Sequence, residues 1–82
     1  EFSAVLRNFD SAETKVLAER IRSNIANYRF KTPQGKLQIT ISIGLSTFRE
    51  KTDCVVLIRQ ADDMLRLSKR SGKNRVIQWA AA

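Results

Sequence analysis

The chain has 82 residues, of which 43% are hydrophobic and 28% are charged, and its formal net charge is +7. These values fit one small globular domain near the lower size limit for a self-sufficient core, and the positive charge favours anionic partners such as nucleotides, nucleic acid or a membrane surface. With no histidine and one cysteine, Cys54, the chain cannot form an intrachain disulfide or a Ser-His-Asp or Cys-His catalytic group, and a structural zinc site is not expected.

A short strand is predicted at residues 2–7, where Phe2, Ala4 and Leu6 alternate on one face. The chain thus begins inside a structural element, which suggests that it is a fragment of a longer protein. No apolar run approaches the roughly 20 residues needed to cross a bilayer, and no signal peptide is visible, so a cytoplasmic location is the default expectation.

The first helix is predicted to run from about Ser11 to Tyr28. Asp10 is its expected N-cap, with Glu13 as the capping-box partner. Glu19 and Arg22 are predicted to face water. Apolar residues at helical spacing predict one buried stripe, formed by Val16, Leu17, Ile21, Ile25 and Tyr28.

A turn that contains Pro33 and Gly35 is predicted to close a small hairpin between residues 29–31 and 37–39. Residues 37–46 then alternate strictly between apolar and small polar side chains, which makes this segment the clearest predicted strand. Gly44 within it indicates either a bulge or a close approach to the backbone, and the bulge is the preferred interpretation.

The second helix is predicted to begin at Thr52 or Asp53 and to end at Gly72, a residue free to take a positive φ. A last strand follows at residues 76–79. The predicted fold class is therefore α/β (α+β), in the order β-α-(hairpin)-β-α-β, with helices packed on a small sheet. The expected buried face of this helix consists of Val55, Ile58, Ala61, Leu65 and Ser68.

Residues 58–76 hold the densest positive charge of the chain, and this segment poses the functional question. Such a helix end can complement the negative end of the helix dipole, or it can hold phosphate. From spacing alone the first interpretation is preferred for Lys69 and Lys73, and a surface role for the arginines. Asp62 and Asp63 point about 100° apart on a helix, which favours a solvated face or a salt bridge to Arg59 or Arg66 over shared metal binding. The cations of this segment are Arg59, Arg66, Lys69, Arg70, Lys73 and Arg75.

Several blocks, in order, give the chain a family resemblance. They are Glu1-Phe2 running into Ser-Ala-Val-Leu, Ala18-Glu19-Arg20-Ile21-Arg22, Thr40-Ile41-Ser42-Ile43-Gly44, Ala61-Asp62-Asp63 and the run from Lys69 to Val76. Together they cover nearly all of residues 1–82, which resemble the C-terminal half of a GGDEF domain, the diguanylate cyclase family. The resemblance implies a β-α-β-α-β half of a nucleotidyl-cyclase-like domain, with helices packed on a small, mainly antiparallel sheet.

Members of that family condense two GTP into cyclic di-GMP and pyrophosphate in bacterial second-messenger signalling, with two GGDEF domains face to face and Mg²⁺ bound by carboxylates. The resemblance places Glu1 at the fourth signature position, close to the metal. In this chain by itself, an N-terminal residue without a role is the preferred interpretation, because a lone carboxylate binds Mg²⁺ poorly. The resemblance assigns Lys69 to the GTP phosphates, and Lys73 to a position of similar function that is often arginine. The Gly-Gly-Asp of the signature and the upstream half would precede Glu1, so Mg²⁺ is not expected to bind tightly to this chain.

The leading hypothesis is therefore a fragment of a diguanylate cyclase that is inactive by itself. The alternative is a degenerate GGDEF-like regulatory or nucleotide-binding module without catalysis. A nucleic-acid-binding domain would rest on charge alone, because aromatic residues are not interleaved with the basic ones. In the family, an upstream strand lies between those matching residues 2–7 and 37–47, so self-association through exposed strands is predicted. The parent could be membrane-anchored outside this segment.

Overall fold

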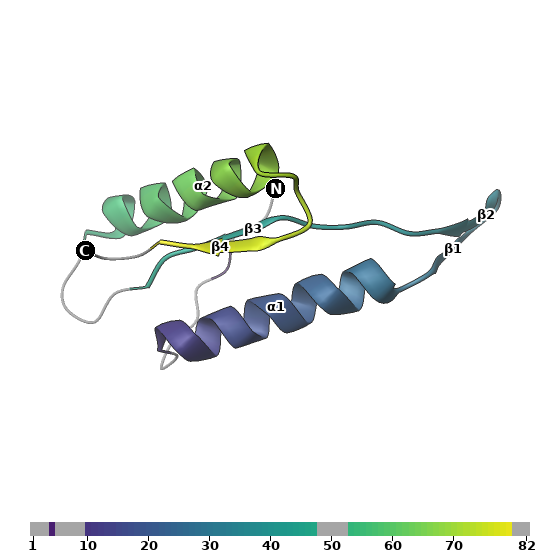
Figure 1. Cartoon of the computed structure of the whole chain (residues 1–82), viewed down its shortest axis with the longest axis horizontal. Coiled ribbons are helices and arrows are strands. Elements are labelled where there is room, and N and C mark those ends of the chain that lie inside the picture. Colours follow the sequence, from purple (N-terminus) through teal and green to yellow (C-terminus); the bar gives the residue numbers. More distant parts are fainter. Residues whose placement is uncertain (1–3, 5–9, 48–52, 80–82) are drawn as a thin grey trace.

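The computed structural model describes Ala4, residues 10–47 and residues 53–79. The strand predicted at residues 2–7, apart from Ala4, and the possible cap Thr52 lie outside these residues. Figure 1 shows the central strands lying between the two helices, with a hairpin extending away from them. The elements in chain order are α1 (Ser11–Asn27), β1 (Phe30–Thr32), β2 (Gly35–Leu37), β3 (Ile43–Leu45), α2 (Cys54–Arg70) and β4 (Val76–Gln78).

Helix α1 begins as the sequence predicts, and its capping box is confirmed. The Glu13 backbone N–H donates to Oδ1 of Asp10 at 2.7 Å, and the Asp10 backbone N–H is 3.5 Å from Oε1 of Glu13. The two bonds satisfy donors that lack a partner in the first helical turn, and both carboxylates lie at the positive end of the helix dipole. The helix ends at Asn27 because Tyr28 takes an extended backbone conformation.

The apolar stripe predicted for α1 is wrong in part. Val16 is 61% exposed and Tyr28 is 58% exposed, whereas Thr14 and Ala18, four residues apart on one face, are the buried residues of the helix. This face turns toward β3 and β4, where small side chains allow close packing. The longer apolar side chains on the neighbouring faces have little of the described chain to pack against.

The hairpin is confirmed as an antiparallel pair, although its strands β1 and β2 lie at 30–32 and 35–37 rather than at the predicted 29–31 and 37–39. Phe30 is opposite Leu37, and Thr32 is opposite Gly35. Gly35 has φ 122°, which suits a residue without Cβ. The continuous strand predicted at residues 37–46 is wrong, because only 35–37 and 43–45 belong to strands. Alternation predicts an extended chain, but a strand also needs a partner, and residues 38–42 have none among the described strands.

Strands β3 and β4 form a parallel pair, with Ile43, Gly44 and Leu45 opposite Val76, Ile77 and Gln78 in turn. This register is unbroken at Gly44, so the preferred bulge interpretation is wrong. The glycine instead admits α2 to the strand: a Cβ at residue 44 would overlap the Ala61 carbonyl oxygen and the Leu65 backbone nitrogen, and would lie 2.8 Å from the Leu65 Cα. Helix α2 therefore packs backbone against backbone on β3.

Much apolar surface remains exposed in the described residues. Among the described residues, Ala18 is the apolar residue with less than a tenth of its surface exposed, and Ser68 is fully buried. Val55 and Ile58, both predicted on the buried face of α2, are 60% and 63% exposed. The helices and the β3–β4 pair thus leave open faces that a larger domain or a second chain could cover. Within the described part of the chain, neither helix has the length and apolar character required to cross a membrane.

Candidate functional site

The candidate site is the C-terminal end of α2 together with the turn that leads into β4. Asp53 starts the helix, accepting a 2.9 Å hydrogen bond from the Val55 N–H at its carboxylate. Lys69 and Arg70 occupy the last turn and are exposed. Their charge complements the partial negative charge of the free carbonyl groups at this end. A cationic, solvent-accessible helix end is therefore present where the sequence predicts one.

Residues 72–74 form a left-handed turn after the helix. The φ angles are 128° at Gly72, 63° at Lys73 and 49° at Asn74. The Lys73 N–H donates to the Ser68 carbonyl at 2.9 Å, the bond that closes a Schellman-type helix end. Helical geometry thus does not persist from Lys69 to Lys73. The two lysines lie at the same end of α2, one on the helix and one on the turn.

Ser68 ties the helix end to both strands. Its hydroxyl is fully buried and donates to the Arg75 carbonyl at 2.8 Å. The same carbonyl accepts the Ile43 N–H at 3.0 Å, which begins the β3–β4 ladder. A buried hydroxyl needs such a partner, because leaving it unpaired costs about 1–3 kcal/mol. The turn that holds Lys73 is therefore fixed at its helix end and at its strand end.

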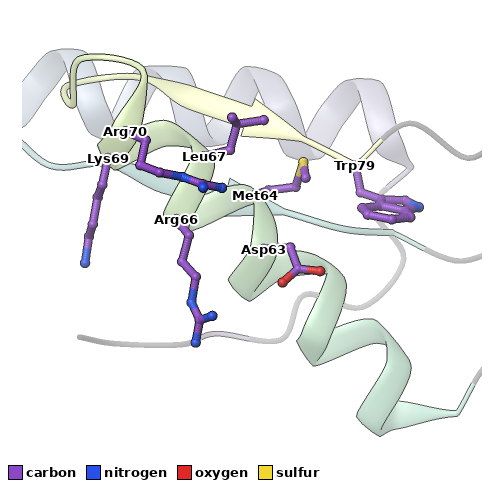
Figure 2. Close-up of a pocket in the computed structure, with 7 residues that line it drawn as sticks. All are labelled: Asp63, Met64, Arg66, Leu67, Lys69, Arg70 and Trp79. Carbon is purple, nitrogen blue, oxygen red and sulfur yellow. The ribbon is translucent and has the colours of Figure 1, made fainter.

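A shallow groove of about 630 Å³ lies along α2, on the side where Trp79 follows the end of β4 (Figure 2). Arg66, Lys69 and Arg70 all line it, with their charged ends directed apart in Figure 2, and Lys73 is not among the lining residues. Arg66 also pairs with Asp62 at 3.2 Å, which is one of the alternatives that the sequence leaves open. The residues lining the groove are Asp63, Met64, Arg66, Leu67, Lys69, Arg70 and Trp79.

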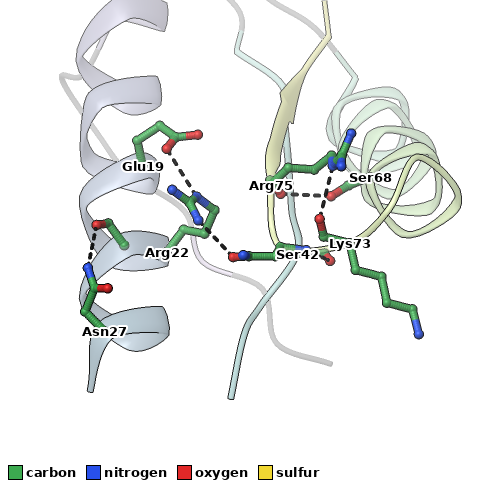
Figure 3. Close-up of polar contacts among 9 residues, drawn as sticks. Glu19, Arg22, Asn27, Ser42, Ser68, Lys73 and Arg75 are labelled. Carbon is green, nitrogen blue, oxygen red and sulfur yellow. Dashed lines mark hydrogen bonds and ion pairs between the residues drawn. The ribbon is translucent and has the colours of Figure 1, made fainter. Parts of the chain in front are cut away.

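A second polar cluster reaches the turn from the opposite side, and sequence reasoning missed it. Arg22 on α1 pairs with Glu19 at 3.2 Å and donates from Nη1 to Oδ1 of Asn74 at 2.8 Å. The Asn74 N–H in turn donates to Oγ of Ser42 at 3.2 Å. Arg22 is predicted to face water from helical spacing, but its side chain is only 21% exposed. Figure 3 shows this cluster between α1 and the strands.

Clusters of metal-ligating side chains are absent from the described residues. Across residues 10–47 and 53–79, no three side chains of the His, Cys, Asp or Glu type lie close enough to share a metal ion. Glu1, the residue assigned near the metal by resemblance, lies outside the described residues. Since Mg²⁺ prefers carboxylate oxygens in octahedral geometry, the groups at the end of α2 suit phosphate oxygens rather than the metal.

The comparisons with known proteins define the class to which the chain belongs. The family model for the GGDEF domain of diguanylate cyclases matches residues 1–75. The chain therefore belongs to the GGDEF domain family, as its sequence blocks predict, and the α+β fold is confirmed.

Particular relatives agree with this assignment. The diguanylate cyclase DosC of Escherichia coli strain K12 is 39% identical over the whole chain, which spans 18% of DosC. An uncharacterized membrane protein of Staphylococcus epidermidis is 32% identical over 94% of the chain and 22% of its own length. The active GGEEF domain of a diguanylate cyclase from Vibrio cholerae superposes with a TM-score of 0.81 and 28% identity, over 94% of this chain and 49% of that one. The chain thus spans only a part of the relatives it matches.

Proposed function

We propose that this chain is the C-terminal half of a catalytic diguanylate cyclase domain, and that the protein containing it condenses two GTP into cyclic di-GMP with release of pyrophosphate. The observation that carries the proposal is the family match over residues 1–75. The structural likeness to an active GGEEF domain, over 94% of this chain, supports it. Because the substrate and product belong to intracellular signalling, the domain acts in the cytoplasm under this proposal.

Lys69 and Lys73 are the residues proposed to contact the GTP phosphates. Both are exposed and lie at the same end of α2, Lys69 in the last helical turn and Lys73 in the left-handed turn that follows. Each ammonium group can donate to phosphate oxygens as a compact positive charge, although it lacks the planar two-pronged geometry of arginine. The lysines would neutralise part of the triphosphate and hold it in place, which lowers the barrier by positioning and by charge stabilisation.

The remainder of the site is proposed to lie outside the described residues. Mg²⁺, when bound, would neutralise the triphosphate and favour deprotonation of the attacking 3′-hydroxyl. Glu1 is proposed to be one acid near that metal. The described residues of this chain contribute the cationic end of α2, so their role is to bind and orient phosphate.

The proposal is tested by incubating the longer protein that contains this chain with GTP and Mg²⁺ and analysing the products by chromatography and mass spectrometry. We expect cyclic di-GMP and pyrophosphate, and removal of Mg²⁺ with EDTA should abolish both. GTP binding without any product would contradict catalysis and favour a GGDEF-like regulatory module.

Self-association of the chain is also proposed, through its exposed strands or as a GGDEF–GGDEF pair. Its basis is the apolar surface left open on both helices and the strand-less segment at residues 38–42. Unpaired backbone groups next to apolar side chains readily add another strand. Light scattering over a concentration series should show a mass that rises with concentration, whereas a constant monomer mass would contradict this proposal.

A further inference from the structure

The polar cluster on α1 is connected to the turn that holds Lys73. The two partners in its central hydrogen bond, Arg22 and Asn74, are 52 positions apart in sequence. Glu19 holds the same guanidinium through Nε, which leaves Nη1 directed at Asn74. The Arg22 side chain therefore has its charge partly neutralised and its direction fixed by residues of the protein itself.

The segment that Arg22 contacts needs such support. Lys73 and Asn74 both have positive φ angles, 63° and 49°. The left-handed region costs an L-residue roughly 1–2 kcal/mol, and less for asparagine, whose short side chain can form local hydrogen bonds. Two consecutive residues of this kind keep their conformation only when the surroundings hold them.

Bonds on several sides hold this turn. Helix α2 accepts the Lys73 N–H, and the Arg75 Nε donates to the Lys73 carbonyl at 3.0 Å. Ser42 accepts the Asn74 N–H. Arg22 provides the contact from α1 to the Asn74 side chain, and Figure 3 shows the Lys73 side chain extending away from that helix. The backbone at residue 73 is thus fixed while its ammonium group stays accessible.

We infer that Arg22 is a positioning residue for the phosphate contact of Lys73: it holds Asn74, and through it the left-handed turn, so that the ammonium group meets a nucleoside triphosphate. The inference rests on the proposed function, since it requires Lys73 to contact phosphate. Under this inference Arg22 acts through Asn74 and not on the nucleotide: its Nε donates to Glu19 and its Nη1 donates to Asn74.

The test is a double-mutant cycle in the longer protein, with affinity measured by calorimetry. The ligand is a GTP analogue with a methylene group between the α and β phosphorus atoms, which cannot release pyrophosphate. Loss of one charge-assisted contact in Lys73→Ala should weaken binding about tenfold. Arg22→Ala should weaken binding of the analogue about threefold to fivefold, because Lys73 still contacts the phosphate but is less well positioned.

The deciding quantity is the effect of Arg22→Ala when Lys73 is already alanine. We expect that effect to disappear, because a residue acting through Lys73 has nothing left to position. Asn74→Gly keeps the positive φ but removes the acceptor, so it should reproduce Arg22→Ala. The control Lys15→Ala removes one exposed charge from α1 and should leave the affinity unchanged.

The possible outcomes separate the two claims. If Lys73→Ala weakens binding but Arg22→Ala has no effect, or an equal effect in both backgrounds, the positioning role is wrong and the phosphate role stands. If Lys73→Ala leaves the affinity unchanged, the proposed phosphate contact is wrong, and the positioning role falls with it. Thermal unfolding of each variant shows whether a loss of affinity comes only from unfolding.

Discussion

Replacing Gly44 with alanine should lower the free energy of unfolding of the domain by about 3 kcal/mol or more. The added methyl group would overlap backbone atoms of Ala61 and Leu65, which cannot move aside like the end of a flexible side chain. Helix α2 would have to shift away from β3, and its packing on the strand pair would be lost. Urea-induced unfolding of the domain, followed by circular dichroism, measures the effect.

Gly35→Ala is the matched control for this substitution. No atom lies within 4 Å of a Cβ built at residue 35, but its φ of 122° is unfavourable for alanine. Gly35→Ala therefore introduces backbone strain without atomic overlap, and it should lower the free energy of unfolding by about 1 kcal/mol. Equal destabilisation by the two substitutions would contradict the close approach of α2 to β3.

Replacing both Lys69 and Lys73 with alanine should weaken binding of the α,β-methylene GTP analogue to the longer protein about 100-fold. Each lysine is expected to supply one charge-assisted contact worth about 1.4 kcal/mol, which corresponds to a factor of ten. Affinity for guanosine, which has no phosphate, should not change. Isothermal titration with the two ligands separates phosphate contacts from contacts to the base.

A double variant with the same change in net charge controls for long-range attraction. Lys15 and Lys31 are both exposed and lie on α1 and β1, away from the end of α2. Lys15→Ala combined with Lys31→Ala should weaken binding less than threefold at about 0.15 M salt, where distant charges are screened. A similar loss in both double variants would assign the effect to net charge and contradict specific contacts at Lys69 and Lys73.

The helices and the hairpin could be predicted from local sequence because their signals are local. Asp10 with Glu13 marks the start of α1, and Gly72 marks the end of α2. The failures concern packing between distant segments. The strand predicted at residues 37–46 lacks a partner over its middle, and the glycine at position 44 serves a helix that approaches from residues 61–65. Alternation and glycine content do not specify which element will pack there.

In the candidate site, too, some features could be predicted from the sequence, whereas a contact between distant segments could not. The positions of Lys69 and Lys73 followed from the family resemblance, and the structure adds that they lie on two differently folded pieces of backbone. The contact between Arg22 and Asn74 could not be predicted, since helical spacing only predicts that Arg22 faces outward. The sequence Gly-Lys-Asn after a basic helix end was a usable signal for a left-handed turn, because glycine and asparagine tolerate positive φ.

We propose that this chain holds the phosphate-binding part of a cyclase site, and that most of the metal-binding residues lie outside this chain. The most direct measurement is cyclic di-GMP formation from GTP and Mg²⁺ by the 82-residue chain, beside the longer protein at equal concentration. Circular dichroism first establishes that the chain is folded. We predict product from the longer protein and none from the 82-residue chain. Cyclic di-GMP made by the 82-residue chain alone would contradict the claim, because these residues would then suffice for catalysis.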